Sequence, residues 1–239
     1  MRESGGKAGT ASKRKERDTM EQPSTFLQRC HGTIAAQDRM RIFGHKPVTI
    51  WLTGLSGAGK STIAFKLEEH LVSLGHACYV LDGDNVRHGL ASDPGFERND
   101  RRENIRRVAH VAQLMNDAGL IVITALISPM NDDRAMAREI IGSGKFVETY
   151  LSAPVATCAR RDPKGLYAKA MAGEIASFTG VSAPYEAPAN PELHIDTATQ
   201  TPVESVAQIF DYLRASSLET TATATAAATS NIRRQASAG

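Results

Sequence analysis

The chain contains Gly54-Leu55-Ser56-Gly57-Ala58-Gly59-Lys60-Ser61, followed by Thr62, and this run fits the phosphate-binding pattern G-x-x-x-x-G-K-[ST]. The apolar run Val48–Thr53 precedes it and the helical spacing of Ile63–Leu74 follows it, which is the strand–loop–helix context that the pattern requires. Glycines let backbone N–H groups close around phosphate oxygens, and the helix N-terminus adds partial positive charge. A glycine-rich turn without a ligand is the alternative, which the agreement of pattern and context disfavours. The run therefore predicts a site for a nucleoside triphosphate.

Two residues of this loop have expected roles. Lys60 is expected to reach the β- and γ-phosphates, and the Ser61 hydroxyl is expected to bind Mg²⁺. ATP and Mg²⁺ are therefore the predicted cofactors. GTPases, ATPases, nucleotide kinases and metabolite kinases all carry such a loop, so the reaction must be inferred from other residues.

Apolar runs and helical spacings alternate along the rest of the chain. Leu120–Ile127 is almost entirely apolar, as a strand buried on both faces should be. The pattern predicts an α/β domain of the P-loop NTPase fold, with a parallel five-stranded sheet covered by helices on both faces in three layers. In such sheets, ligands bind beyond the carboxyl ends of the strands. The other strands are expected at 48–53, 77–81, 146–151 and 193–196, and the helices at 63–74, 105–118, 135–141, 156–161 and 203–213.

Composition divides the 239 residues into four segments. Residues 1–22 are predicted to be a disordered basic extension, because they offer too little apolar surface to offset the entropy of ordering. Residues 23–46 are an N-terminal segment that can form a helix. Residues 47–214 are the P-loop domain, and residues 215–239 are an Ala/Thr/Ser tail that is expected to be disordered.

Bulk properties exclude several classes of protein. The formal charge of +2 and the hydrophobic fraction of 41% predict a globular chain that binds neither nucleic acid nor a membrane. The sequence contains no run of about 18 apolar residues, so no membrane span is predicted. The N-terminus lacks the apolar core of a signal peptide. Its acidic residues also disfavour a transit peptide. The dispersed cysteines Cys30, Cys78 and Cys158 form no CxxC motif, so a cytoplasmic location is expected.

Two carboxylates follow the strand expected at 77–81. Asp82 and Asp84 come at the carboxyl end of that strand, which lies near the phosphates in this architecture. One can take a proton from an acceptor hydroxyl, and the other can order Mg²⁺ through water. Arg87 can hold an anionic acceptor. An ordinary acidic turn is the alternative.

Basic residues dominate two further segments. Five arginines lie between residues 98 and 107, where Arg101 and Asn104 share a helix face; they can clamp phosphate or sulfate, or form a salt-bridged surface. Residues 160–167 suit a mobile lid that excludes water, or a basic surface loop. Phe178, which lies beside turn residues, can stack on a base, although core packing is the commoner fate of phenylalanine.

Several short motifs, in their order along the chain, resemble those of the APS kinase family. The resemblance covers about residues 47–214, and the ordered set is far more specific than any single motif. It implies transfer of phosphate from ATP to the 3′-hydroxyl of adenosine 5′-phosphosulfate (APS), giving 3′-phosphoadenylyl sulfate (PAPS) and ADP in sulfate assimilation. The motifs are Gly54–Thr62, Leu81–Leu90, Asp100–Arg107, Ile127–Pro129, Arg161–Tyr167, Gly173–Ile175 with Phe178–Gly180, and Pro184–Pro188.

The resemblance also implies roles for individual residues. Asp84 matches the family's proposed base, and Arg161 matches a neighbour of the ATP base. Ser128 matches a serine described as a phosphorylated intermediate, although direct in-line transfer needs no phosphoserine. Asp82 stays the expected Mg²⁺ partner of Ser61. The residues that would form the acceptor site are Arg87, Arg101 and Asn104, which match residues that hold the adenylylsulfate, Phe96 and Phe178 around its adenine, Ile127 and Ser128 lining the same pocket, and Lys164 and Leu166 in the lid.

The family is commonly dimeric, so a homodimer is expected, with APS as the small-molecule partner. Sulfurylase–kinase fusions occur in the family, but 239 residues are too few for a sulfurylase domain, which predicts a free-standing enzyme. One alternative is another P-loop metabolite or nucleotide kinase. The other is an inactive nucleotide-binding module, which the presence of Lys60 and Asp84 disfavours. Departures from the usual pattern, none at a proposed catalytic group, occur at Pro94, Glu97, Leu126, Met130 and Ala168.

Overall fold

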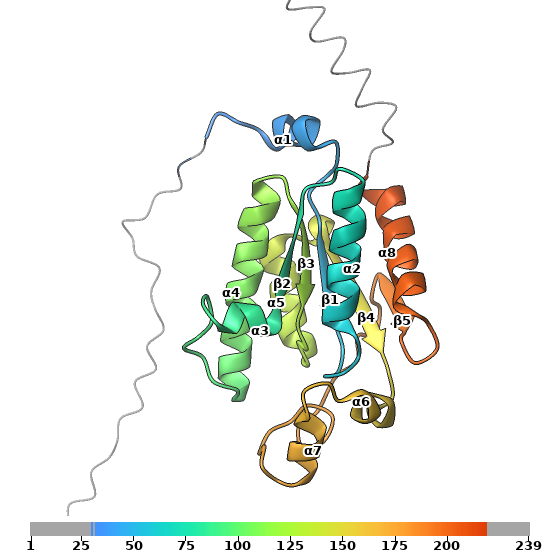
Figure 1. Ribbon diagram of the computed structural model, residues 1–239. Helices are drawn as coiled ribbons and strands as arrows, with labels where there is room; N and C mark the ends of the chain where they lie inside the picture. The colour runs from blue at the N-terminus through green and yellow to red at the C-terminus, as the bar shows by residue number, and fades with distance from the viewer. Residues whose placement is uncertain (1–29, 31, 219–239) are drawn as a thin grey trace, which may run out of the picture. The chain divides into compact units, whose positions relative to one another are not determined.

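The computed structural model describes residue 30 and residues 32–218 (Figure 1). Every helix and strand named below lies between residues 34 and 218. The predicted extension, residues 1–22, lies outside the described residues, and so do residues 219–239 of the predicted tail.

Five parallel strands form one sheet in the order β2-β3-β1-β4-β5. Every residue of β1 and of β3 is buried, because both strands have neighbours on each side and helices over both faces. The predicted parallel five-stranded sheet is therefore confirmed. The strands are β1 (Thr49–Thr53), β2 (Cys78–Asp82), β3 (Ile121–Ala125), β4 (Phe146–Ser152) and β5 (Leu193–Asp196).

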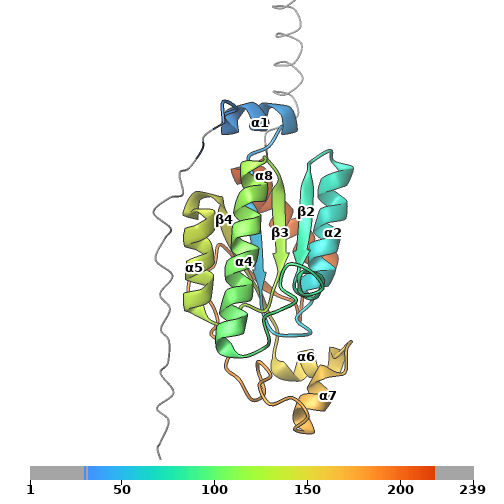
Figure 2. The ribbon, with the colours of Figure 1, turned by 90° about the vertical axis from the view of Figure 1, so that its left-hand side faces the viewer.

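Helices cover both faces of the sheet in three layers. The pair α2 (Lys60–Ser73) and α8 (Pro202–Ser216) packs on one face, and α4 (Arg98–Asp117) and α5 (Asn131–Ile141) pack on the other, as Figures 1 and 2 show. Successive side chains of a strand point to opposite faces. Accordingly, Leu52 of β1 packs in the core beneath α2 and α8, whereas its neighbour Trp51 packs beneath α4 and α5.

Short helices occupy the two ends of the sheet. The helix α6 (Val155–Arg161) agrees with the predicted 156–161, and it lies with α7 (Leu166–Met171) beyond the carboxyl ends of the strands (Figure 1). The sequence did not predict α3 (Gly83–Arg87) or α7, because five or six residues show no helical periodicity. The remaining elements are α1 (Ala36–Phe43) and the 3₁₀ turn η1 (Ser143–Lys145).

The C-terminal helix extends past the predicted domain boundary at residue 214. It continues to Ser216, and Leu218 forms an isolated bridge with His45. Apolar spacing ends at Leu213, which is why the predicted helix at 203–213 ends before α8 does. Among the described residues, none of the helices combines the length and the apolar character that crossing a bilayer requires.

Candidate active site

A cavity of about 1370 Å³ lies at the carboxyl ends of the strands. Cavities for one small molecule are typically about 300–1,000 Å³, so this volume suits a donor and an acceptor together. The cavity brings together nearly all the predicted site residues. Gly54 and Leu55 are the exceptions: both lie outside its lining, and Leu55 instead lines a shallower hollow of about 540 Å³.

The phosphate-binding loop connects β1 to α2. Its conformation needs glycine, since Gly57 and Gly59 have φ of +75° and +90°. Lys60, the first residue of α2, is 8% exposed, and its Nζ donates to the carbonyl oxygens of Gly54 at 2.9 Å and Leu55 at 2.6 Å. Burial lowers the pKa of Lys60 to about 8. An anionic phosphate beside this ammonium would therefore restore its charged form.

The two expected metal ligands are adjacent. The Ser61 hydroxyl donates to Asp82 Oδ2 at 2.6 Å, and Asp82 Oδ1 accepts the backbone N–H of Asp84 at 3.0 Å. Among the described residues, no three His, Cys, Asp or Glu side chains gather as they would around a metal ion. Mg²⁺ commonly binds through one or two protein oxygens together with phosphates and water, so this hydroxyl–carboxylate pair fits it.

The predicted base contacts the predicted lid. The Asp84 carboxylate forms an ion pair with Lys164 Nζ, and both side chains are more than half exposed. Tyr167 of α7 is 1% exposed, and its hydroxyl donates to the Ser56 carbonyl oxygen at 3.0 Å. The segment expected to be a lid is thus attached to the phosphate-binding loop at one point and to the acceptor side at another.

Arg101 and Arg87 hold the backbone around the two phenylalanines. Arg101 donates to the Phe96 carbonyl oxygen at 2.6 Å, to Thr179 Oγ1 at 2.7 Å and to the Ser177 carbonyl oxygen at 2.6 Å. The Arg87 guanidinium lies 4.4 Å from the centroid of the Phe96 ring. Both arginines line the cavity, so they shape the wall as well as supply positive charge.

Three other arginines of the cluster pair with carboxylates. Arg102 pairs with Asp133 at 3.1 Å, Arg106 pairs with Glu103 at 2.7 Å, and Arg107 also donates to Glu103, at 2.8 Å. The alternative interpretation, a salt-bridged helix face, therefore applies to these three arginines. Glu103 lies three and four residues from Arg106 and Arg107, the spacing of neighbours on a helix, whereas Asp133 is 31 residues from Arg102 and no local pattern pairs them.

Asn104 and the two phenylalanines complete the acceptor side. Asn104 is 6% exposed, and its Oδ1 has no hydrogen-bond partner within the part of the chain that the structure describes. A buried acceptor of this kind in a cavity wall is suited to a ligand donor. Phe96 is 66% exposed, whereas Phe178 is 7% exposed and packs edge-on to Tyr167, so Phe178 belongs to both the core and the cavity wall.

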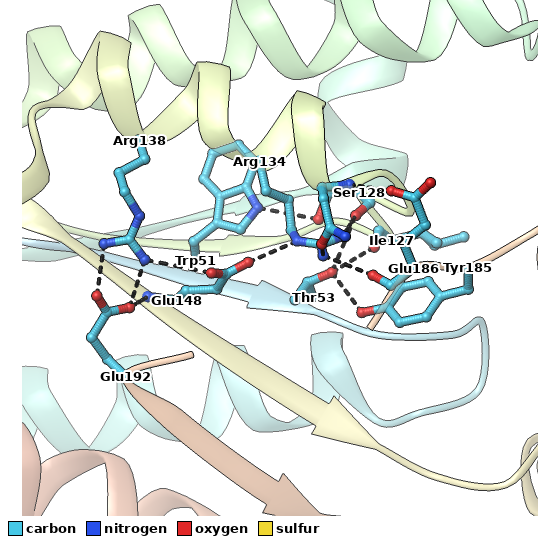
Figure 3. A network of polar contacts seen from close by, with 11 residues as sticks. Trp51, Thr53, Ile127, Ser128, Arg134, Arg138, Glu148, Tyr185, Glu186 and Glu192 are labelled. Carbon is cyan, nitrogen blue, oxygen red and sulfur yellow. Dashed lines mark hydrogen bonds and ion pairs between the residues drawn. The ribbon is translucent and has the colours of Figure 1, made fainter. Parts of the chain in front are cut away.

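The loop after β3 forms another part of the wall. Ser128 is 2% exposed and has φ of +38°, a left-handed conformation in a residue other than glycine. Trp51 Nε1 donates to Ser128 Oγ at 3.1 Å, and Thr53 Oγ1 donates to the Ile127 carbonyl oxygen at 2.8 Å (Figure 3). The predicted residues Ile127 and Ser128 both line the cavity.

Arg161 marks the other end of the cavity. It donates to the carbonyl oxygens of Gly57 at 3.3 Å and Thr197 at 2.5 Å. Thr197, Gln200 and Pro202, which follow β5, also line this end, and the sequence analysis did not select them. They have no catalytic chemistry, and only the position of β5 in the sheet brings them beside the phosphate-binding loop.

Comparisons with known proteins agree on one family. A sequence model described as adenylylsulphate kinase matches residues 46–196. The adenylyl-sulfate kinase of Citrobacter koseri is 56% identical over 181 residues, which are 76% of this chain and 90% of that protein. The bifunctional enzyme NodQ of Rhizobium tropici is 60% identical over 176 residues, or 74% of this chain, but this chain spans 28% of its length.

A solved structure is similar over the same region. The Mycobacterium tuberculosis APS kinase CysC in complex with AMPPNP and APS aligns with a TM-score of 0.68 and 46% sequence identity. The alignment covers 70% of this chain and 98% of that one.

Proposed function

Because this chain belongs to the adenylylsulphate kinase family, we propose that it transfers the γ-phosphoryl group of ATP to the 3′-hydroxyl of APS, giving PAPS and ADP. One observation carries the proposal beyond the family assignment. A single cavity contains the phosphate-binding loop together with an aromatic and arginine-bearing wall. APS is an anion with an adenine ring, so its recognition needs both positive charge and aromatic faces.

The donor side of the cavity binds ATP. The N–H groups of Ser56–Thr62 and the Lys60 ammonium stabilise the charge that develops on the transferred group. Arg161 lies at the end of the cavity where the ATP base would bind. Ser61 and Asp82 would hold Mg²⁺, which when bound neutralises negative charge on the β- and γ-phosphates.

The acceptor side orients APS and removes a proton. Asp84 accepts the proton of the 3′-hydroxyl as that oxygen attacks; its backbone bond to Asp82, the expected partner of Mg²⁺, supports this role. Arg87, Arg101 and Asn104 hold the anion and ribose, and Phe96 and Phe178 enclose the adenine. Ile127 and Ser128 close the wall, and Ser128 needs no covalent phosphate in a direct transfer.

The lid excludes water from the reaction. Lys164, in the segment that joins α6 to α7, and Leu166, the first residue of α7, both line the cavity. Water that reached the γ-phosphoryl group would hydrolyse ATP without forming product, so covering the site favours transfer. Lys164 also exchanges its contact with Asp84 for the acceptor anion when APS binds.

The proposal extends to the organisation of the protein. The catalytic domain comprises residues 47–214, the protein acts in the cytoplasm, and it forms a homodimer, as the sequence and its resemblance to APS kinases lead us to expect. Light scattering of the purified chain tests the dimer, and fractionation of cells tests the location.

A coupled assay with ATP, Mg²⁺ and APS, followed by identification of the product, tests the activity. We expect PAPS and ADP in equal amounts. Turnover of a nucleoside monophosphate or of gluconate, with none of APS, would refute the proposal and favour another metabolite kinase.

A further inference from the structure

A network of buried and partly buried polar side chains lies behind the acceptor wall (Figure 3). At its centre is Arg134 of α5, whose side chain is 2% exposed. Its Nε donates to Glu148 Oε1 of β4 at 2.7 Å, its Nη1 donates to the Ser128 carbonyl oxygen at 2.6 Å, and its Nη2 donates to the Glu186 carbonyl oxygen at 2.7 Å. One guanidinium thus joins a central strand to two loops.

The first of these loops is strained. The left-handed conformation of Ser128 is unfavourable for a residue with a side chain, and it persists when surrounding contacts over-determine it. Arg134 supplies one of those contacts. The Thr53 hydroxyl supplies another through the Ile127 carbonyl oxygen. Because Ile127 and Ser128 line the cavity while Arg134 lies outside its lining, the arginine acts on the wall from behind.

The second loop is attached to the first. Glu186 donates its backbone N–H to the Pro129 carbonyl oxygen at 2.8 Å, and its carboxylate accepts the backbone N–H of Asn131 at 2.8 Å. The neighbouring Tyr185 hydroxyl lies 2.9 Å from Thr53 Oγ1. Arg134 therefore spans a junction at which the two loops already touch.

We propose that Arg134 is a positioning residue that fixes the Ile127–Ser128 wall and thereby sets how tightly and in what alignment the acceptor binds. This role rests on the proposed function, since it presumes an acceptor on that side of the cavity. A planar guanidinium directs several N–H donors at once, whereas a lysine ammonium is a point charge on a flexible stem. Lysine at this position would keep the charge opposite Glu148 but lose the simultaneous bonds to the two loop carbonyls.

Steady-state kinetics of Arg134→Lys in the full chain test the role. We expect kcat/KM for APS to fall about 10-fold to 10²-fold, because misplacing a wall by about 1 Å costs that much, while KM for ATP stays unchanged. Arg138→Lys is the matched control. Arg138 also lies on α5 and contacts Glu148, at 3.4 Å, but its other bonds go to Glu192 and Phe146 rather than to the two loops.

If the assignment is correct, the control Arg138→Lys leaves both kcat/KM for APS and KM for ATP unchanged. Equal losses on the ATP and APS sides in Arg134→Lys, or the same selective loss in Arg138→Lys, would overturn it. If Arg134→Lys does not fold, Thr53→Val provides the second variant. It is nearly isosteric and removes the contacts of the hydroxyl with the carbonyl oxygens of Ile127 and Ser128 and with the Tyr185 hydroxyl, so the same wall should loosen and the same selective loss on the APS side should follow. Unchanged APS kinetics would refute the idea that contacts behind this wall set acceptor binding.

Hydrogen exchange separates this inference from the proposed function, because it needs no substrate. The amides of Asn131 and Glu186 bond across the loop junction, so they should exchange faster in Arg134→Lys than in the wild type and at the wild-type rate in Arg138→Lys. If the wild type does not phosphorylate APS but the two amides still exchange faster in Arg134→Lys, the acceptor is not APS, while Arg134 still positions the wall. Unchanged exchange in Arg134→Lys would refute the positioning role whatever the substrate.

Discussion

Lys60 is a charged side chain that is buried, and removing its ammonium group from water costs free energy. Its burial lowers its pKa to about 8, so a substantial fraction is neutral at pH 8 before any phosphate binds. The carbonyl oxygens of Gly54 and Leu55 that accept its N–H groups are uncharged partners. The residue therefore gains more from a bound polyphosphate than an exposed lysine would.

Proton uptake on ATP binding follows from this. Phosphate charge raises the pKa of Lys60, so at pH 8 the complex binds more protons than the free components. Calorimetry in two buffers with different ionisation enthalpies measures that uptake. Lys60→Met should abolish it and weaken ATP binding. Uptake that is equal in wild type and variant would contradict the assignment.

Asp84→Ala tests the proposed base. We expect kcat to fall about 10²-fold or more while ATP still binds, because the carboxylate takes the acceptor proton only as transfer occurs. Glu97→Ala, which changes a carboxylate in the same cavity that has no assigned role, is the control. Near-normal turnover by Asp84→Ala would show that another group is the base.

At the scale of elements, the conformation of the phosphate-binding loop depends on its close approach to β4. A Cβ at Gly54, where φ is +152°, would lie 2.4 Å from the backbone carbonyl oxygen of Leu151 in β4. No flexible atom can move aside to relieve that contact, so the loop itself would shift. Gly75 also has positive φ, but it has open space around it.

These two glycines give a matched pair of variants. Gly54→Ala should abolish detectable ATP binding, because the loop's N–H groups no longer converge on the phosphates. Gly75→Ala should leave ATP binding intact and lower the free energy of unfolding by about 1 kcal/mol, the cost of a left-handed alanine. Binding titrations and urea denaturation measure the two effects. Normal ATP affinity in Gly54→Ala would show that the close approach is unimportant.

At the scale of the whole molecule, the described ionisable groups make the folded protein more stable at neutral pH than at acidic pH. Burial lowers the pKa values of His45 and His76, which lie 3.3 Å apart between their Nδ1 atoms. Hydrogen bonds from Arg106 hold the pKa of Glu103 at about 2, and a hydrogen bond from Arg107 lowers that of Asp93. In each case the unfolded chain binds protons more readily, so stability falls as protons are added.

We expect the thermal unfolding midpoint to fall in two pH windows. The first begins as pH drops below about 6.5, the ordinary pKa of histidine, and the second lies between about pH 4.5 and pH 2, where unfolded glutamate is protonated and Glu103 is not. His76→Asn should flatten the first window, and Glu103→Gln should flatten the second. A midpoint that is constant from pH 7 to pH 5 would contradict the histidine effect.

Local patterns predicted most of the fold. The glycine spacing at 54–59 requires one loop conformation, and fully apolar runs such as Ile121–Ala125 fit only a strand covered on both faces. Apolar spacing predicted a helix only from 105, and the shared face of Arg101 and Asn104 was the one sign of earlier turns; α4 begins at Arg98, because its first two turns are polar. Apolar periodicity cannot detect such turns.

Site residues could be predicted where a short motif identifies them. They could not be predicted where their role depends on partners that are distant in sequence. Lys60, Asp84 and Arg101 follow from motif and spacing, and all line the cavity. Arg134 lies in an ordinary helical pattern, and its partners Glu148 and Glu186 are 14 and 52 residues away. Only the folded sheet brings them together, so no sequence pattern identified the network.

The strand order has a consequence for how new specificities can arise. Because β1 is central, the loop that follows it divides the cavity: residues after β2 and β3 form one half, and residues after β4 and β5 form the other. The proposed acceptor site draws on both halves, because Lys164, Leu166 and Phe178 follow β4 while segments 83–104 and 126–130 follow β2 and β3. A new acceptor specificity therefore needs coordinated changes on both sides of the phosphate-binding loop, since Arg101 after β2 also bonds to Ser177 and Thr179 after β4.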